Sequence, residues 1–201
     1  MLTIWGRLNS HNVKKVAWAA IEMGLPHHRI DMGGPFGFTP EYLAKNPNRM
    51  IPTIEDGDLV LWESNAILRY LADRHAPSFR ADDPAIRAAG DKWMDWQFHF
   101  ADAQRDAFLG CVREGKDASD PAVARSAEAS GAMMRILDAE LATRPWLSGD
   151  RFGIADIPMG VYAHTFFSLA VPRPDVPHLA EWYARLRQRP GYASQVMIPL
   201  T

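Results

Sequence analysis

The sequence predicts a small α/β domain at residues 1–77, followed by an all-helical domain at residues 85–201. In the first part, short apolar runs suited to strands alternate with helical patterns, as in α/β domains. In the second part, apolar residues recur only at helical spacing. Residues 76–84 lie between them, contain two prolines and several charged residues, and are expected to form a linker.

The α/β part begins with a strand, a helix and a second strand. Residues 2–6 are a short apolar run that suits a buried strand. Residues 12–23 have apolar positions at helical spacing, and Gly24 offers the left-handed conformation at which helices often end. Residues 28–32 predict a second short strand, after which several glycines interrupt the pattern.

A short helix, a hairpin and a longer helix complete the α/β part. Thr39 is the expected cap of the short helix, which ends before Pro47. Asp56-Gly57 lies between two apolar runs and is a strong hairpin signal. The two strands of the hairpin and the helix after them are expected at residues 51–54, 58–62 and 63–75.

The second part contains four long helical patterns, at residues 85–114, 122–142, 155–169 and 179–188. Asp156 follows Gly153 by three residues, which is the spacing of a carboxylate that caps a helix start. We expect Asp156 to accept a hydrogen bond from the Gly153 N–H. Its expected role is therefore in folding and not in catalysis.

The composition limits the classes of partner. The chain has 201 residues, 47% of them apolar, so it can bury a full core. A formal net charge of -2 offers no basic patch for nucleic acid, and no apolar run approaches the roughly 20 residues that cross a membrane. The single cysteine, Cys111, and the scattered histidines indicate no disulfide and no metal site. We expect a cytoplasmic protein.

Two segments of the α/β part carry a family resemblance. Residues 46–57 read Asn-Pro-Asn-Arg-Met-Ile-Pro-Thr-Ile-Glu-Asp-Gly, and residues 61–67 read Leu-Trp-Glu-Ser-Asn-Ala-Ile. Together they resemble the glutathione-site signature of the cytosolic glutathione transferases, and residues 147–156 are similar to the helix-start motif of that family's C-terminal domain. The resemblance implies a thioredoxin-like α/β domain, glutathione as co-substrate, a small hydrophobic electrophile as second substrate, and a homodimer.

Residues 9–16 look closest to the serine-type, phi- and theta-like enzymes of that family and their bacterial relatives. Gly6 and Arg7 stand where the tyrosine classes carry their aromatic hydroxyl. The cysteine of the beta class is also missing, because no thiol precedes Cys111.

Ser10 is accordingly the candidate catalytic residue, as stabiliser of the glutathione thiolate. It lies immediately before a predicted helix, whose N–H groups and dipole favour an anion, and its hydroxyl can donate to the sulfur. Asn12 is a second candidate donor. The alternative for Ser10 is plain helix capping.

The resemblance also implies residues that bind the glutathione peptide. Pro52 takes the place of a cis-proline that exposes the backbone of Ile51, next to Met50, to the cysteinyl part of glutathione. Glu63 and Ser64 begin a helix whose N–H groups suit the γ-glutamyl carboxylate, while the acidic side chain suits its ammonium group. The alternatives are an ordinary edge-strand proline and two surface residues that compensate the helix dipole.

Two features depart from the family pattern. Gly37-Phe38 stands where phi-type enzymes place basic residues, which leaves the glycyl carboxylate of glutathione without an assigned partner. Arg49 replaces the usual glycine of the Asn-Pro-x-Gly turn and implies a different backbone angle there. Arg49 either supplies the missing positive charge or is a solvated side chain.

The first long helix has an unusual number of aromatic residues. Helical spacing places Trp93, Trp96 and Phe100 on one face, and the resemblance implies that one face of this helix lines the electrophile site. Packing against a neighbouring helix is the alternative. Residues near Phe166 and Met197 are further candidates.

The leading functional hypothesis is transfer of the glutathione thiolate to an electrophilic carbon, without a covalent enzyme intermediate. One alternative is glutathione-dependent reduction of disulfides or peroxides, because the same bound thiolate can serve a different acceptor. The other is a binding module that keeps the fold without catalysis.

Overall fold

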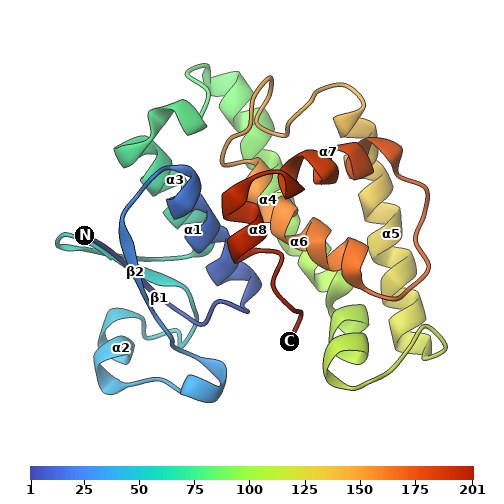
Figure 1. The fold of residues 1–201 in the computed structure, drawn as a ribbon, viewed down its shortest axis with the longest axis horizontal. Helices are drawn as coiled ribbons and strands as arrows, with labels where there is room; N and C mark the ends of the chain where they lie inside the picture. The colour runs from blue at the N-terminus through green and yellow to red at the C-terminus, as the bar shows by residue number, and fades with distance from the viewer.

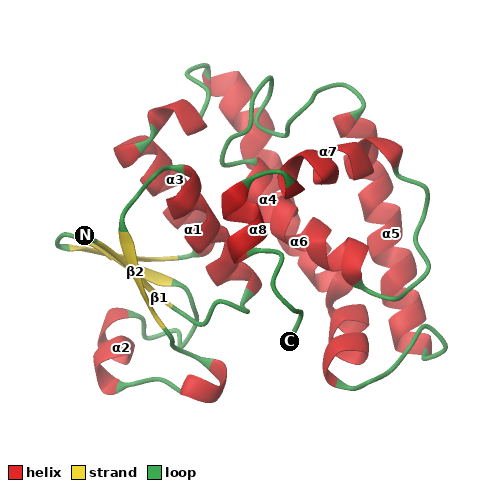
Figure 2. Cartoon of the chain, viewed as in Figure 1, coloured by secondary structure: helices red, strands yellow, loops and turns green.

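The computed structural model describes residues 1–201 and shows a mixed sheet packed beside a group of longer helices (Figure 1). The sheet belongs to the first part of the chain, and every later element is helical (Figure 2). The strands are β1 (Leu2–Trp5), β2 (His27–Ile30), β3 (Thr53–Asp56) and β4 (Leu59–Trp62). Three helices flank them, namely α1 (His11–Glu22), α2 (Pro40–Lys45) and α3 (Ser64–His75). The predicted fold class, a thioredoxin-like domain followed by a helical domain, is confirmed.

The sheet has the order β2-β1-β3-β4. β1 and β2 are connected through helix α1 and pair in parallel, and β3 and β4 form the predicted antiparallel hairpin. Alternate strand residues face opposite layers. Leu2 and Ile4 of β1 pack against α1 and α3 on one face, whereas Trp5 packs against Tyr42 of α2 on the other.

The helical part contains five α-helices, and α4 continues into a π-helical turn. The bounds are α4 (Pro84–Phe108), η3 (Leu109–Arg113), α5 (Pro121–Leu141), α6 (Asp156–Ser168), α7 (Pro177–Arg187) and α8 (Pro190–Gln195). Short 3₁₀ turns lie at η1 (Gly34–Phe36) and η2 (Pro77–Phe79). The sequence pattern predicted α4 and η3 as one helix and did not predict α8. None of the helices combines the length and the apolar character that a membrane span requires.

Several element bounds differ from the prediction for local reasons. β3 begins at Thr53, two residues late, because Pro52 lacks an N–H for the sheet and follows a cis peptide bond. The hairpin turn lies at Gly57-Asp58, one residue late, since Gly57 adopts the positive φ of 62° that the turn needs. α3 begins at Ser64, because Glu63 has a non-helical φ of 72°.

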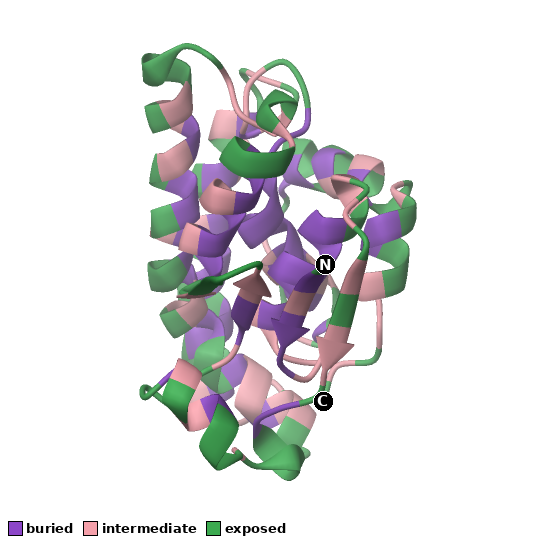
Figure 3. Ribbon diagram, turned by 90° about the vertical axis from the view of Figure 1, so that its left-hand side faces the viewer, coloured by how far each residue is buried: buried purple, intermediate pink, exposed green.

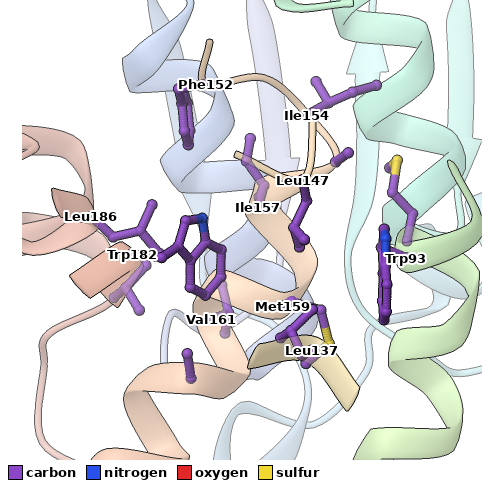
Figure 4. Packing of buried hydrophobic residues seen from close by; sticks show 14 of the residues in the cluster. Trp93, Leu137, Leu147, Phe152, Ile154, Ile157, Met159, Val161, Trp182 and Leu186 are labelled. Carbon is purple, nitrogen blue, oxygen red and sulfur yellow. The ribbon is translucent and has the colours of Figure 1, made fainter. Parts of the chain in front are cut away.

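One hydrophobic core joins the two parts of the molecule. Its 25 buried residues come from α1 and α3 of the first part and from most elements of the second. Trp182 lies beside Leu186 and Val161, and Trp93 lies across the cluster from it (Figure 4). Buried residues occupy the middle of the molecule, whereas loops and outer helix faces are exposed (Figure 3). Because α1 and α3 are anchored in this core, their N-termini are held in place relative to α4 and α6.

Candidate functional site

Three chain segments leave the sheet at the same end. Trp5 is paired with Thr53, and Thr53 is paired in turn with Trp62. The loop after β1, the loop before β3 and the loop after β4 therefore start from one row of residues across the sheet. These loops, together with the first turns of α1 and α3 that follow two of them, carry all the residues that the sequence assigned to glutathione. The fold thus brings together Ser10, Asn12, Ile51, Pro52, Glu63 and Ser64.

The loop after β1 passes close to the loop before β3. Gly6 has a φ of 148°, and a Cβ placed on it would lie 3.2 Å from Cβ of Ile51 and 2.5 Å from Cγ2 of Val13. A side chain at this position would therefore separate the two loops. This close approach explains why Gly6 follows the strand directly, and it places the start of α1 next to the Ile51-Pro52 peptide.

Ser10 is the N-cap residue of α1. Its φ of -75° and ψ of 128° are the extended values typical of an N-cap, yet its side chain makes no capping hydrogen bond. The hydroxyl is half-buried and remains available to an external acceptor. The N–H groups of the first turn of α1 add positive potential at the same place.

The N-termini of α1 and α3 are joined by side chains. The Ser64 hydroxyl donates to Oδ1 of Asn12 over 3.3 Å, and Ser64 is only 3% exposed. Two helix ends with unsatisfied N–H groups therefore lie next to each other. This arrangement is suited to an anionic ligand.

Lys15 is a site residue that sequence reasoning missed. It follows Asn12 by almost one helical turn, and its side chain is fully buried. Nζ donates to Oγ of Ser64 over 3.3 Å, to Oδ1 of Asn65 over 3.4 Å, and to Oε1 of Gln97. Burial lowers the pKa of Lys15 to about 7, although the nearby Glu63 carboxylate opposes the shift. A signal existed in the sequence, because two lysines interrupt the apolar positions of this helix.

The loop before β3 has the predicted cis peptide bond between Ile51 and Pro52. Side chains of α2 and of the residue that follows it fix this loop. Asn46 Nδ2 donates to the Met50 carbonyl and to Thr53 Oγ1, each over 3.1 Å. Tyr42 also donates from its hydroxyl to the Met50 carbonyl. The Ile51 backbone is thereby presented in a fixed direction at the site.

Two residues without the freedom of glycine take left-handed backbone angles. Arg49 has a φ of 58° and Glu63 a φ of 72°, and both side chains are exposed. The different angle that the sequence implied at Arg49 is therefore wrong, because Arg49 keeps a left-handed φ of the kind that glycine adopts. Such conformations store strain and are concentrated at binding sites. Glu63 takes this conformation as the N-cap residue of α3, and its side chain makes no capping hydrogen bond.

The three aromatic residues expected in the second-substrate pocket belong to the core side of α4. Trp93 is 5% exposed and Phe100 is fully buried, and both are members of the large core cluster. Trp96 packs against the same cluster and against Trp93, with ring centroids 5.2 Å apart. Their positions match the packing alternative, because all three side chains pack in or against the core cluster that α4 shares with α5 and α6.

A cavity of about 220 Å³ lies next to the start of α1, between α4 and α6. Its aromatic wall consists of His11, Phe108 and Tyr162; the other lining residues are Ala101, Asp102, Gln104, Arg105 and Leu109. The rings of His11 and Tyr162 are stacked with centroids 4.7 Å apart. His11 directly follows Ser10 in the chain and connects this wall to the N-terminus of α1.

His11 is held as a neutral ring. Its Nε2 lies 2.7 Å from Oγ1 of Thr165. Burial lowers the pKa of His11 to about 3, and the positive charges of Lys14 and Lys15 add to the shift. Burial likewise raises the pKa of the Tyr162 hydroxyl. The wall of the cavity is therefore aromatic and uncharged at neutral pH.

A larger hollow of about 690 Å³ lies beside the C-terminal residues of the chain. Its lining includes Met197 to Leu200 from the C-terminal segment, together with Cys111 and His164. The Asn9 side chain, next to Ser10, donates to the hydroxyl of Thr201. The end of the chain therefore closes over the region around α1, and Met197, a candidate from the sequence, borders this hollow.

The fold and the site together define the class of the protein. A thioredoxin-like domain presents a cis-proline loop, a serine hydroxyl at a helix N-terminus and a second helix N-terminus at one end of its sheet, and a helical domain adds an aromatic cavity. Such an arrangement suits a protein that binds a small anionic ligand at its helix N-termini and brings it to an apolar partner.

Comparison with known proteins identifies the family. Residues 9–74 match the family model described as glutathione S-transferase, N-terminal domain, and residues 100–190 match the one described as glutathione S-transferase, C-terminal domain. Glutathione S-transferase GstB of Escherichia coli (strain K12) is 40% identical, with each chain covered over 100% of its length. Glutathione S-transferase 3 of Zea mays is 31% identical over 99% of this chain and 95% of its own.

A solved structure agrees with these sequence matches. The theta class glutathione S-transferase from Xanthomonas axonopodis pv. citri, with glutathione bound, superimposes with a TM-score of 0.93 at 48% identity, over 100% of this chain and 99% of that one. The chain belongs to the glutathione S-transferase family, and the protein is a glutathione transferase.

Proposed function

We propose that this glutathione transferase is of the serine type and conjugates the glutathione thiolate to small hydrophobic electrophiles, with Ser10 as the catalytic residue. The observation that carries the proposal is the Ser10 hydroxyl, which sits at the N-terminus of α1 without a capping bond. A donor placed there stabilises a sulfur anion more than a thiol. It therefore lowers the thiol pKa and raises the fraction of reactive thiolate.

The surrounding groups support a defined orientation of the peptide. The cysteinyl part pairs with the Ile51 backbone, which the cis-proline loop presents next to Ser10. The γ-glutamyl end lies at the N-terminus of α3, where Ser64 receives its carboxylate and Glu63 its ammonium group. Asn12 and Met50 border these contacts, and Arg49 is the charge offered to the glycyl carboxylate.

The electrophile is proposed to occupy the cavity formed by His11, Phe108 and Tyr162. One residue of this wall, His11, directly follows Ser10 at the N-terminus of α1, and we infer that a sulfur held by the hydroxyl faces the wall. Because His11 is neutral and stacked on Tyr162, the wall favours flat apolar molecules. Trp93, Trp96 and Phe100 support this cavity indirectly, through the packing of α4.

We also propose that the enzyme works in the cytoplasm as a homodimer, in agreement with the family resemblance. The support is a set of exposed apolar side chains on one edge of the sheet and on α4, which are Leu59, Val60, Trp62 and Phe98. An edge strand with exposed apolar residues is usually covered by another chain.

The decisive test is the Ser10→Ala variant. We expect the apparent pKa of bound glutathione to rise by about one unit or more and turnover of an aryl halide to fall about tenfold or more, because one hydrogen bond to the thiolate is lost. The thiolate absorbance and the pH dependence of the rate measure both quantities. Asn9→Ala, one residue earlier and outside the proposed contacts, is the matched control.

Two outcomes would contradict the proposal. Unchanged turnover in Ser10→Ala would assign the thiolate to Asn12 or to backbone donors. Turnover of disulfides or hydroperoxides without conjugation of any aryl halide would show that reduction is the reaction of this thiolate.

A further inference from the structure

Lys15 is a buried cation whose direct partners are all neutral. Its ammonium group contacts the hydroxyl of Ser64 and the amide oxygens of Asn65 and Gln97, and it forms no salt bridge. Two aromatic rings complete its surroundings, since Nζ lies 5.5 Å from the centroid of Phe98 and 5.7 Å from that of Tyr162. A buried charge with no opposite charge in contact is rare in proteins, because desolvation is then poorly compensated.

The charged groups around Lys15 do not neutralise it. On its own helix, Lys14 and His11 are basic groups, and the Lys14 ammonium is turned away to the Val196 carbonyl at 3.1 Å. From α6, Tyr162 presents a neutral phenol, and from α4, Asp102 acts on that phenol. Glu63, at the start of α3, is the one acidic group that acts on Lys15, and it is exposed to solvent.

Lys15 also determines the direction in which the Ser64 hydroxyl can donate its hydrogen bond. An ammonium group only donates, so the Oγ atom of Ser64 accepts from Lys15. The hydrogen of the Ser64 hydroxyl is then free to point away from Lys15, toward Asn12 or toward a ligand at the helix N-termini. The γ-glutamyl carboxylate proposed at Ser64 would therefore be separated from the positive charge of Lys15 only by the Ser64 side chain.

We propose that Lys15 is a positioning residue of the glutathione site, whose ammonium group orients Ser64 and is balanced by the γ-glutamyl carboxylate, so that glutathione binding takes up a proton onto Lys15. This inference rests on the proposed placement of the γ-glutamyl end at α3. The proton comes from solvent, and no covalent bond forms or breaks.

The direction of the pH dependence follows from the charge balance. In the free protein, burial holds the pKa of Lys15 at about 7, so the amine is partly neutral at pH 7.5. A bound carboxylate favours the charged form and raises this pKa. Binding therefore takes up protons just above neutrality, and affinity decreases as the pH rises above 7.

The test uses S-methylglutathione, which has no thiol proton to release. Titration calorimetry at pH 7.5 in two buffers of different ionisation enthalpy measures the protons taken up on binding. We expect Lys15→Met to lose a substantial fraction of the uptake of the wild-type protein and to bind about tenfold more weakly. Because the amine of the ligand contributes equally to both proteins, the difference between them belongs to Lys15.

Two further variants separate charge from packing. Lys15→Arg keeps a positive charge at all pH values, so it should retain affinity better than Lys15→Met and show equally little uptake. Lys14→Met removes the neighbouring buried lysine, whose ammonium faces the C-terminal segment, and should keep the uptake of the wild-type protein.

The outcomes distinguish this inference from the proposed function. Wild-type uptake in Lys15→Met, or an affinity within twofold of wild type, would overturn the role of Lys15 while leaving the glutathione site in place. If Lys15→Met does not fold, uptake in Lys15→Arg equal to that of the wild type would overturn it. No binding heat in the wild-type protein would remove the proposed placement of glutathione, and this inference with it.

Discussion

Asp156 shows how one buried carboxylate can organise a helix start. It is fully buried and accepts hydrogen bonds from the N–H groups of Leu147, Ser148 and Gly153 and from the indole of Trp182, at 2.8 to 3.3 Å. The predicted bond from Gly153 is confirmed. The other three bonds join α6 to the preceding loop and to α7, so the residue stabilises more than its own helix.

Replacing Asp156 by Ala should lower the free energy of unfolding by about 3 kcal/mol, because several buried donors then lose their acceptor. Urea denaturation measures the loss. Asp150→Ala, an exposed aspartate of the same segment, is the control and should change stability by less than about 0.5 kcal/mol. A loss below about 1 kcal/mol in Asp156→Ala would show that water or the backbone replaces the carboxylate.

Ser10 and Lys15 differ in how visible they are in the sequence. Ser10 precedes a clear helical pattern, so its position at a helix N-terminus follows from local periodicity. The burial of Lys15 depends on Ser64, Asn65 and Gln97, which lie 49 to 82 residues away in the chain. No local pattern reports such contacts, and a lysine in a helix is ordinarily solvated.

At the scale of elements, the turn before the cis-proline loop contains a strained residue, Arg49. This residue is exposed, takes a φ of 58°, and forms no ion pair. Arg49→Gly should raise the free energy of unfolding by about 0.5 to 1 kcal/mol, because glycine adopts this angle without a steric penalty. Thermal or urea denaturation measures the gain.

Asn48→Gly is the matched control for this prediction. Asn48 is the adjacent exposed residue and does not have a positive φ, so glycine there should destabilise by about 0.5 to 1 kcal/mol through backbone entropy. If both variants lose stability to the same extent, the left-handed angle at Arg49 carries no measurable strain. The glutathione affinity of Arg49→Gly also reports whether the guanidinium contributes to binding.

The predicted elements agree with the structure where local signals are strong. The sequence predicted the hairpin, the capped short helix and the amphipathic helix α1, because turn chemistry and periodicity act over a few residues. The short helix α8 escaped prediction because it has six residues and is held mainly by Tyr192, whose ring packs against Trp18 with centroids 4.8 Å apart. Tertiary packing, and not helical propensity, accounts for it.

At the scale of the whole molecule, His11 connects the two parts of the chain. It begins α1, hydrogen-bonds to Thr165 of α6, stacks on Tyr162 of α6, and meets the ring of Phe108 of α4 edge-on. Its pKa of about 3 lies below the ordinary value of 6.5, so the unfolded chain binds a proton that the folded protein excludes. The contribution of His11 to the free energy of unfolding is therefore complete above pH 6.5 and decreases as the pH falls toward 3.

The His11→Phe variant should remove this pH dependence, because phenylalanine keeps the aromatic stack but cannot be protonated. Between pH 6 and pH 4, the wild-type free energy of unfolding should fall more steeply than that of the variant, by about 1 kcal/mol per pH unit. Urea denaturation at several pH values measures the two slopes. His164, whose pKa is lowered to about 4, contributes equally to both proteins. Equal slopes would contradict the assignment.

The order of the strands and helices as far as α7, the fold class and the main candidate residues of the site followed from the sequence by itself. Strand and helix periods, the glycine and proline positions and the two signature segments act within short stretches of chain, and they placed Ser10, Pro52 and Glu63 at loops.

Only the tertiary structure decided what surrounds these residues. It turned Lys15 inward as a buried cation, moved the aromatic cavity from Trp93 and Phe100 to His11 and Tyr162, and gave Asp156 its additional donors. The physical reason is that burial and its electrostatic consequences depend on groups far apart in the chain, which meet only when α1 packs between the sheet and the helical part.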